Sequence, residues 1–144
     1  MNPIALQRLS YKLRKIPLVP KLITLFIRLI FGCYLPYQIK LGENFVVGYG
    51  GIGIVVHHRT LVGNNVHIDQ NVTIGGTSKK FGVPKLGSNI YIGAGAIILG
   101  PINIGDDVVI GANAVVINDV PSGSLVVGIP GKVVKTNIFK SDYV

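Results

Sequence analysis

Three histidines are the residues of this chain best suited to proton transfer: His57, His58 and His67. An imidazole changes charge near neutral pH, so it can take the proton of an attacking hydroxyl. His57 follows the aliphatic Val56 and is expected at a corner that opens onto a groove. We therefore rank His57 first as a general base and His58 second, and we expect His67 on the surface.

A run of short repeats must position these histidines. Aliphatic residues recur, mostly at every sixth position, and most are followed by a small or polar residue: Leu41, Val47, Val56, Val62, Ile68, Ile74, Leu86, Ile92, Ile98, Ile104, Ile110 and Val116. This period is typical of a parallel β-helix, in which three six-residue segments close one coil. Two steps are longer, because three residues are inserted at 48–53 and the polar stretch 77–85 replaces one repeat.

Composition narrows the remaining classes of protein. The chain has 144 residues, of which 49% are apolar and 14% charged, and this favours one packed domain over disorder. Cys33 is the single cysteine, so an internal disulfide and a cysteine-rich zinc site are excluded. The repeats lack the stacking aromatic residues of nucleic-acid-binding surfaces, and no nucleic-acid partner is expected.

The basic charge is concentrated near the N-terminus. Residues 1–40 contain seven Lys and Arg and no acid, whereas residues 41–144 contain seven bases and six acids. The patterns of 4–16 and 18–31 predict two helices, and Pro17 and Pro20 stop the first of them. The second is too short to cross a bilayer and no cleavage site follows, so we expect a cytoplasmic protein. The helices are expected to cap the solenoid or to contact the inner face of a membrane.

The chain resembles the hexapeptide-repeat acyltransferases in three stretches: the repeats LVGNNVHIDQNVTIGG and LGSNIYIGAGAIILGPINIGDDVVIGANAVV, and the closing VPSGSLVVGIPGKVV. Within that family the chain looks most like the serine O-acetyltransferase branch and its relatives that acetylate surface polysaccharides. The resemblance implies an all-β solenoid with left-handed coils, homotrimers, and acetyl-CoA in the groove between adjacent subunits. We expect a helical segment at 1–31, the β-helix at 32–119 with a loop at 77–85, and a C-terminal cap and tail at 120–144.

The stacking of regular coils also predicts a groove for the thioester arm. Counting up from His58 by one regular coil at a time, the same column holds three residues with minimal side chains: Gly76, Ala94 and Ala112. Counting up from His57, it holds glycines that any corner of such a solenoid would need: Gly75, Gly93 and Gly111. We predict cofactor contacts at Gly76, Thr77, Ala94 and Ala112, with backbone N–H groups of Gly75 or Gly76 stabilising the oxyanion. Lys132 matches a basic residue that the family places near the nucleotide end of CoA.

One position departs from the resemblance. Serine acetyltransferases carry an Asp-His pair at the stretch matching Tyr49, Gly50 and Gly51, and Gly50 stands where their basic histidine would be. The role therefore does not carry over to that position. Asp69 could orient an imidazole only across a trimer interface. The loop contributes Lys79, Lys80 and Lys85, which suit an anionic cofactor or a phosphate-linked acceptor.

These observations favour an acetyl-CoA-dependent O-acetyltransferase acting on a sugar hydroxyl during surface polysaccharide assembly. L-Serine is the alternative acceptor, and a non-catalytic β-helix scaffold is the alternative from another class. A γ-type carbonic anhydrase shares the fold but needs three histidines converging on zinc, and adjacent His57 and His58 point to different sides. No metal is expected.

Overall fold

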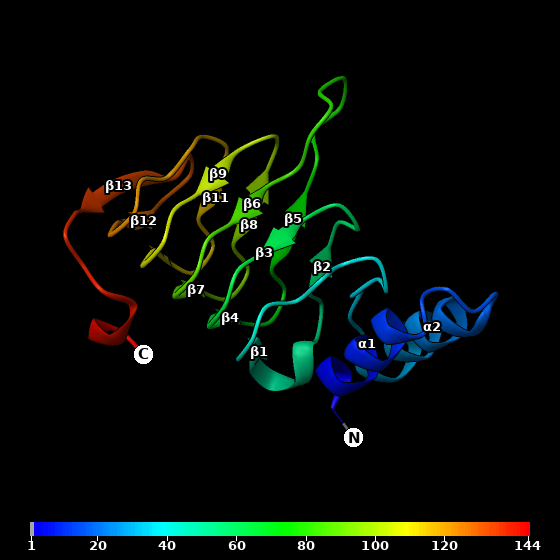
Figure 1. The fold of residues 1–144 in the computed structure, drawn as a ribbon. Helices are drawn as coiled ribbons and strands as arrows, with labels where there is room; N and C mark the ends of the chain where they lie inside the picture. The colour runs from blue at the N-terminus through cyan, green and yellow to red at the C-terminus, as the bar shows by residue number, and fades with distance from the viewer. Residues whose placement is uncertain (1) are drawn as a thin grey trace.

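A computed structural model describes residues 2–144: two helices at the N-terminal end of a stack of short strands (Figure 1). Helix α1 (Pro3–Lys12) is capped at its N-terminus by Asn2, whose side chain accepts a hydrogen bond from the Ile4 N–H at 2.8 Å. Helix α2 (Val19–Phe31) has Pro20 in its first turn and ends at Gly32, whose φ of 62° is left-handed. Within residues 2–144, no helix combines the length and apolar character needed to cross a membrane.

The strands form three sheets that are parallel except at the C-terminal edge. The first sheet contains β1 (Val46–Val47), β4 (Val66–Ile68), β7 (Ile90–Ile92), β10 (Val109–Ile110), β12 (Leu125–Val127) and β13 (Lys132–Lys135). The second contains β2 (Val55–Val56), β5 (Thr73–Gly75), β8 (Ile97–Leu99) and β11 (Val115–Val116). The third contains β3 (Leu61–Val62), β6 (Lys85–Leu86) and β9 (Asn103–Ile104). The first three coils, β1 to β3, β4 to β6 and β7 to β9, each contribute one strand to each sheet, as the six-residue period predicts.

Strand register shows which coils are regular. Ile92 pairs with Ile110, a separation of three six-residue segments, so this coil has the predicted length. Val47 pairs with Ile68, and this coil is longer because the insertion at 48–53 forms the short helix η1 (Gly48–Gly51). Ile68 pairs with Ile92, and this coil is longer by one segment because it contains the polar loop. Both insertions therefore lengthen their coils without disturbing the stack.

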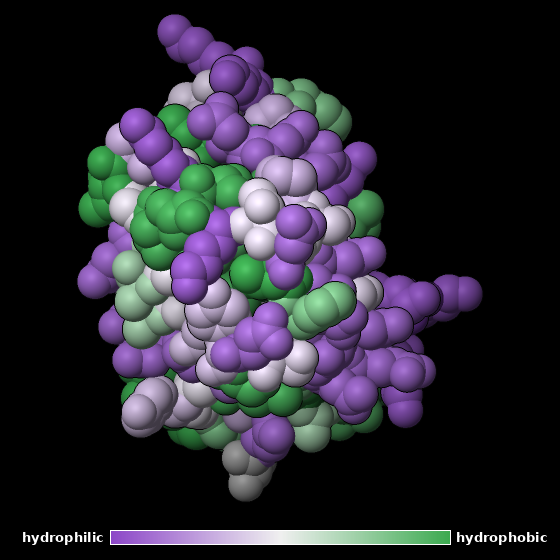
Figure 2. All heavy atoms as spheres, turned by 90° about the vertical axis from the view of Figure 1, so that its left-hand side faces the viewer, coloured by the Kyte–Doolittle hydropathy of each residue, from purple (hydrophilic) through white to green (hydrophobic). Residues whose placement is uncertain are grey.

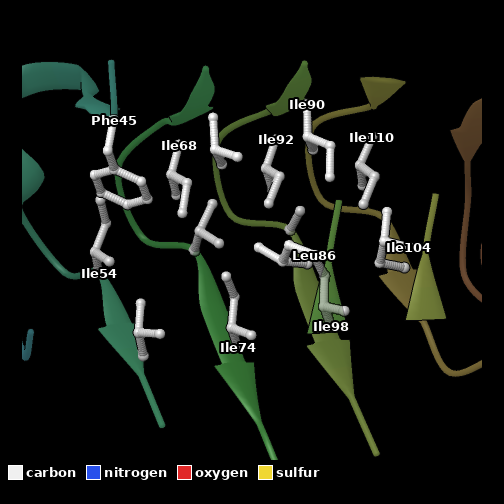
Figure 3. Close-up of a cluster of buried hydrophobic side chains, with 14 of the residues drawn as sticks. Phe45, Ile54, Ile68, Ile74, Leu86, Ile90, Ile92, Ile98, Ile104 and Ile110 are labelled. Carbon is white, nitrogen blue, oxygen red and sulfur yellow. The ribbon is translucent and has the colours of Figure 1, made fainter. Parts of the chain in front are cut away.

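Aliphatic ladders fill the inside of the solenoid. Ile68, Ile92 and Ile110 form one ladder, and Ile74 and Ile98 form another on a second sheet (Figure 3). All five side chains are fully buried. At the corners, asparagine adopts positive φ where the chain must turn, as at Asn65, Asn71, Asn89 and Asn113. The repeat thus places one aliphatic residue inward and one turn-forming residue at each corner.

The two ends of the stack are covered differently. Gln7 of α1 donates to the carbonyl oxygens of Ile39 (2.8 Å) and Pro36 (3.2 Å), so this helix is fastened to the chain just before the first coil. At the other end, β12 pairs in parallel with β10, and β13 then folds back antiparallel to β12. The stack therefore continues beyond residue 119, where the repeat pattern had placed its end.

Candidate functional site

His57 and His58 lie together at the corner that follows β2. Their rings are stacked, with centroids 4.3 Å apart and planes inclined by 29°. The backbone N–H of His57 donates to the Ile74 carbonyl oxygen at 2.8 Å, which fixes this corner to the next coil. The structure therefore brings the two imidazoles predicted to be catalytic to one place, beside the end of β5.

The two rings differ in the hydrogen bonds that they can offer. The backbone N–H of Arg59 donates to His57 Nδ1 at 3.2 Å, so a neutral His57 ring carries its proton on Nε2. Burial, together with the charges of His58 and Arg59, lowers the pKa of His57 and favours this neutral ring. His57 consequently presents an N–H donor, whereas His58 is exposed and its side chain makes no such hydrogen bond among the described residues. This geometry favours His58 as the general base over His57, which the sequence ranked first.

The prediction that Ala94 and Ala112 stack over His58 is wrong. Val56 pairs with Ile74, but Gly75 pairs with Leu99, so the column beside the histidines continues from the Gly75–Gly76 edge to Leu99. A count by regular coils fails here because the coil containing the loop is longer by one six-residue segment. Gly76 and Thr77 do follow β5 at the histidine corner.

Ala94 and Ala112 lie at a different corner, after β7 and β10. The Asn113 N–H donates to the Ala94 carbonyl oxygen at 2.8 Å. The Gly95 N–H donates to the Gln70 carbonyl oxygen at 2.9 Å. The two alanines are therefore neighbours of each other and of Gln70. The structure therefore places the two alanines apart from the histidine corner.

Each corner holds a buried polar atom without a partner. Among the described residues, Thr77 Oγ1 and Gln70 Oε1 are buried and make no hydrogen bond. An unsatisfied buried oxygen is unfavourable unless a ligand supplies a donor. A pantetheine arm carries amide groups that can do so, and both corners have small residues beside these atoms. The residues present therefore fit an acyl-CoA arm.

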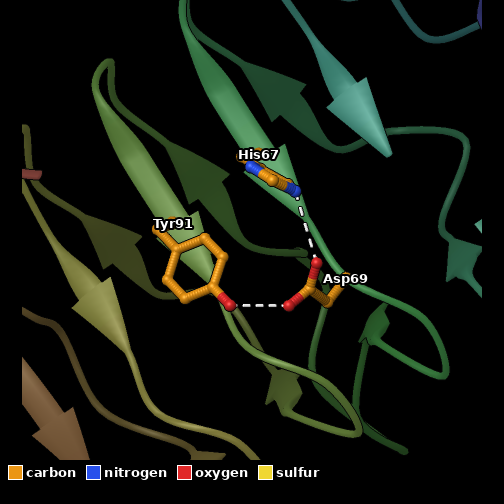
Figure 4. Close-up of polar contacts among 3 residues, drawn as sticks. All are labelled: His67, Asp69 and Tyr91. Carbon is orange, nitrogen blue, oxygen red and sulfur yellow. Dashed lines mark hydrogen bonds and ion pairs between the residues drawn. The ribbon is translucent and has the colours of Figure 1, made fainter. Parts of the chain in front are cut away.

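His67 belongs to a polar cluster on the outer face of the first sheet (Figure 4). Asp69 Oδ1 lies 3.3 Å from His67 Nε2, and the Tyr91 hydroxyl donates to Asp69 Oδ2 at 2.6 Å. The rings of His67 and Tyr91 meet edge to face, with centroids 5.3 Å apart. Tyr91 was not predicted from the sequence, although the longer coil places it opposite His67 in the register. Asp69 thus contacts His67 of its own subunit.

Loss of the Asp69 carboxylate is expected to change how Tyr91 ionises. The hydrogen bond to Asp69, followed by burial and by the charge of Asp69, raises the pKa of Tyr91 to about 12. Since an unfolded tyrosine titrates near 10, this contact stabilises the fold fully below about pH 10 and is lost as the pH rises through the folded value. Spectrophotometric titration should show one late phenol in the wild type, and Asp69→Asn should remove it. A late phenol that persists in Asp69→Asn contradicts the contact.

The polar loop encloses a hollow on the third sheet. A cavity of about 410 Å³ is lined by residues that include Arg59, Phe81, Val83 and Lys85. The Arg59 guanidinium lies 4.4 Å from the centre of the Phe81 ring, a cation–π contact that joins the histidine corner to the loop. Lys79 and Lys80 are exposed on the same loop. Arg59 and Phe81 were not predicted from the sequence, where only the proximity of Arg59 to His58 hinted at a role.

Other predicted positions lie away from the histidine pair. Lys132 is exposed at the start of β13. Cys33 is buried, and burial raises the pKa of its thiol to about 11, so it packs in the core as expected and does not offer a thiolate. Within residues 2–144, no group of three or more His, Cys, Asp and Glu side chains is placed to hold a metal ion.

Comparison with known proteins defines the class. The family described as bacterial transferase hexapeptide (six repeats) matches residues 84–118. The serine acetyltransferase of Neisseria gonorrhoeae superposes with a TM-score of 0.87 at 33% identity, over 94% of this chain and 53% of that chain. The serine acetyltransferase of Brucella abortus, solved in complex with coenzyme A, superposes with a TM-score of 0.88 at 31% identity, over 94% of this chain and 56% of that chain. The fold is thus the left-handed parallel β-helix of the hexapeptide-repeat proteins.

Sequence relatives give the branch. The serine acetyltransferase of Synechococcus elongatus is 42% identical over 123 residues, which are 84% of this chain and 50% of that protein. The serine acetyltransferase of Staphylococcus xylosus is 43% identical over 127 residues, which are 87% of this chain and 58% of that protein. The chain belongs to the hexapeptide-repeat acyltransferase family, in its serine O-acetyltransferase-like branch. It spans about half the length of the relatives that it matches.

Proposed function

We propose that this protein is an acetyl-CoA-dependent O-acetyltransferase. The observation that carries the proposal is the match of 94% of the chain, at a TM-score of 0.88, to a serine acetyltransferase solved in complex with coenzyme A. The stacked imidazoles beside the glycine edge of β5 support it, because acyl transfer to a hydroxyl requires a base near the thioester.

The acceptor in this proposal is a hydroxyl, and the names of the relatives favour that of L-serine. A sugar hydroxyl of a surface polysaccharide is the second candidate. This second candidate is supported by Gly50, an exposed residue that stands where the resemblance places the basic histidine of serine acetyltransferases. A different base position changes how the acceptor must approach the thioester, so the acceptor can differ as well.

The proposed mechanism uses the two imidazoles in different roles. The free nitrogen of His58 takes the proton of the acceptor hydroxyl while the oxygen attacks the thioester carbonyl. The Nε2–H of His57, with backbone N–H groups of Gly75 or Gly76, donates to the oxyanion that forms. The carbon–sulfur bond then breaks, the acetyl ester remains on the acceptor, and the proton passes from His58 to the thiolate of CoA.

We propose that acetyl-CoA binds between subunits of a trimer. Gly76 and Thr77 of one subunit line one wall, and Ala94 and Ala112 of the next line the other, since one subunit holds these pairs at separate corners. Lys132, with the bases of the loop, attracts the phosphates of the nucleotide. The protein acts in the cytoplasm, at the inner face of a membrane.

A larger side chain at Ala112 tests whether this residue lines the proposed groove for acetyl-CoA. Ala112→Leu is expected to raise the KM for acetyl-CoA about tenfold or more while kcat changes little, because the added side chain occupies space used in both ground and transition states. Ala5→Leu, the same change at an exposed position of α1, is the matched control and should leave KM unchanged. An unchanged KM in Ala112→Leu would remove this wall from the groove.

The direct test of the function is release of the CoA thiol from acetyl-CoA by the wild-type protein, with serine and nucleotide sugars as separate acceptors. Acceptor-dependent release with formation of the matching O-acetyl ester supports the proposal and identifies the acceptor class. Intact trimers that release no thiol with any acceptor would favour the non-catalytic scaffold.

A further inference from the structure

Helix α2 has two apolar faces, and only one of them is used by the fold. Pro20, Thr24 and Ile27 face the rest of the protein and are buried. A second set of large apolar side chains remains between 41% and 72% exposed: Leu18, Leu22, Leu25, Phe26, Leu29 and Ile30. Contiguous exposed apolar surface of this kind marks a binding surface.

The exposed set forms a stripe along the helix. Leu18, Leu22, Leu25 and Leu29 are spaced by four, three and four positions, which places them on one face of an α-helix. At about 100° per residue this face is opposite the one that carries Thr24 and Ile27. We call the exposed set from Leu18 to Ile30 the outer face of α2.

Bases border this face, and no acid does. Lys21 and Arg28 are exposed, and their spacing of seven positions places them together on one side of the stripe. The two helices and the segment that follows them, residues 1–40, contain seven Lys and Arg and no Asp or Glu. An apolar stripe bordered by bases suits a surface that is apolar inside and negatively charged at its rim.

Charge also decides between the occupants of this surface. A second copy of the chain would bring its own basic segment against the first, and such like charges repel. An anionic bilayer supplies both acyl chains for the leucines and headgroup charge for Lys21 and Arg28. A helix of 13 residues cannot span the hydrocarbon but can lie along the interface.

The opposite end of the molecule also exposes large apolar side chains, but they come from separate segments, such as Ile129, Val134 and Phe139. Figure 2 views the molecule from the side on which the chain ends in Figure 1, and hydrophobic and hydrophilic residues are interspersed over this face. The apolar stripe of α2, by contrast, follows a single helix.

We propose that the outer face of α2 binds the surface of an anionic bilayer, with the helix parallel to the membrane plane. This inference goes beyond the acetyl transfer and does not depend on it. The stacked coils then extend from the membrane surface with their helical end toward the lipid.

Vesicle co-sedimentation tests the proposal with the intact chain. The wild type should bind vesicles containing phosphatidylglycerol at low salt, bind phosphatidylcholine vesicles weakly, and lose about tenfold or more in affinity at high salt. Leu29→Glu should abolish binding to both kinds of vesicle. Phe139→Glu is the matched control, because Phe139 is similarly exposed but lies near the C-terminus, and it should bind like the wild type.

A second pair of variants separates the two forces. Lys21→Gln/Arg28→Gln should weaken binding to the anionic vesicles only, whereas Lys132→Gln/Lys135→Gln removes the same charge elsewhere and should have little effect. Wild-type protein that stays in solution with anionic vesicles at low salt overturns the proposal. A second outcome would also overturn it: the wild type forms an assembly, and Leu29→Glu dissociates that assembly without changing vesicle binding. The outer face would then be a contact between copies of the chain. Thiol release, measured without lipid, reports separately on the acetyl transfer.

Discussion

Removal of the histidine pair, in His57→Ala/His58→Ala, should lower kcat for acetyl transfer by about 100- to 10,000-fold, the usual contribution of a positioned base. The dissociation constant for acetyl-CoA should change little, since in the proposed mechanism the rings act on the reacting atoms and other residues hold the pantetheine arm. Single variants should divide the loss: His58→Ala removes the base, and His57→Ala removes a donor to the oxyanion. Steady-state thiol release and equilibrium binding of CoA measure the two quantities.

His67→Gln is the matched control for this experiment. His67 is half-buried, as His57 is, but it lies on a different sheet, beside Asp69. Its variant should keep kcat near the wild-type value. Full turnover in the double variant, together with loss of turnover in His67→Gln, would move the base to the His67, Asp69 and Tyr91 cluster.

The fold was predictable because its determinants are local and periodic. A buried aliphatic residue at every sixth position, followed by a residue that tolerates positive φ, specifies inward and corner positions without long-range information. The insertion at 48–53 and the loop at 77–85 were visible as breaks in that period, and the register confirms both. The β12 strand was missed because Ile110 pairs with Val126, two positions short of a regular coil, so the period no longer applies there.

The site was less predictable, because columns depend on the length of each coil. One extra segment in a single coil moved Ala94 and Ala112 away from His58, and the same correction brings Tyr91 opposite His67. Hydrogen bonds such as that from the Arg59 N–H to His57 Nδ1 depend on the shape of a turn.

Tight stacking of backbone against backbone should make Gly63→Ala strongly destabilising. A Cβ at Gly63 would overlap the carbonyl group of Gly87 on the next coil, and one at Gly42 would overlap that of Gly63. The Gly63 N–H also donates to the Leu86 carbonyl oxygen at 3.0 Å, so the backbone cannot retreat without losing a bond between coils. Such overpacking against backbone should lower the free energy of unfolding by about 3 kcal/mol.

Gly75→Ala makes the same chemical change where there is room for it. Its Cβ would meet the Leu99 side chain at 3.5 Å, an ordinary van der Waals contact, and its φ is not positive. The unfolding free energy of this control should stay within about 1 kcal/mol of the wild type. The chain has no tryptophan, so circular dichroism during urea unfolding is the suitable measurement. Equal midpoints for the two variants would mean that the coils can separate at the Gly63 corner, and that aliphatic burial alone sets the spacing of the stack.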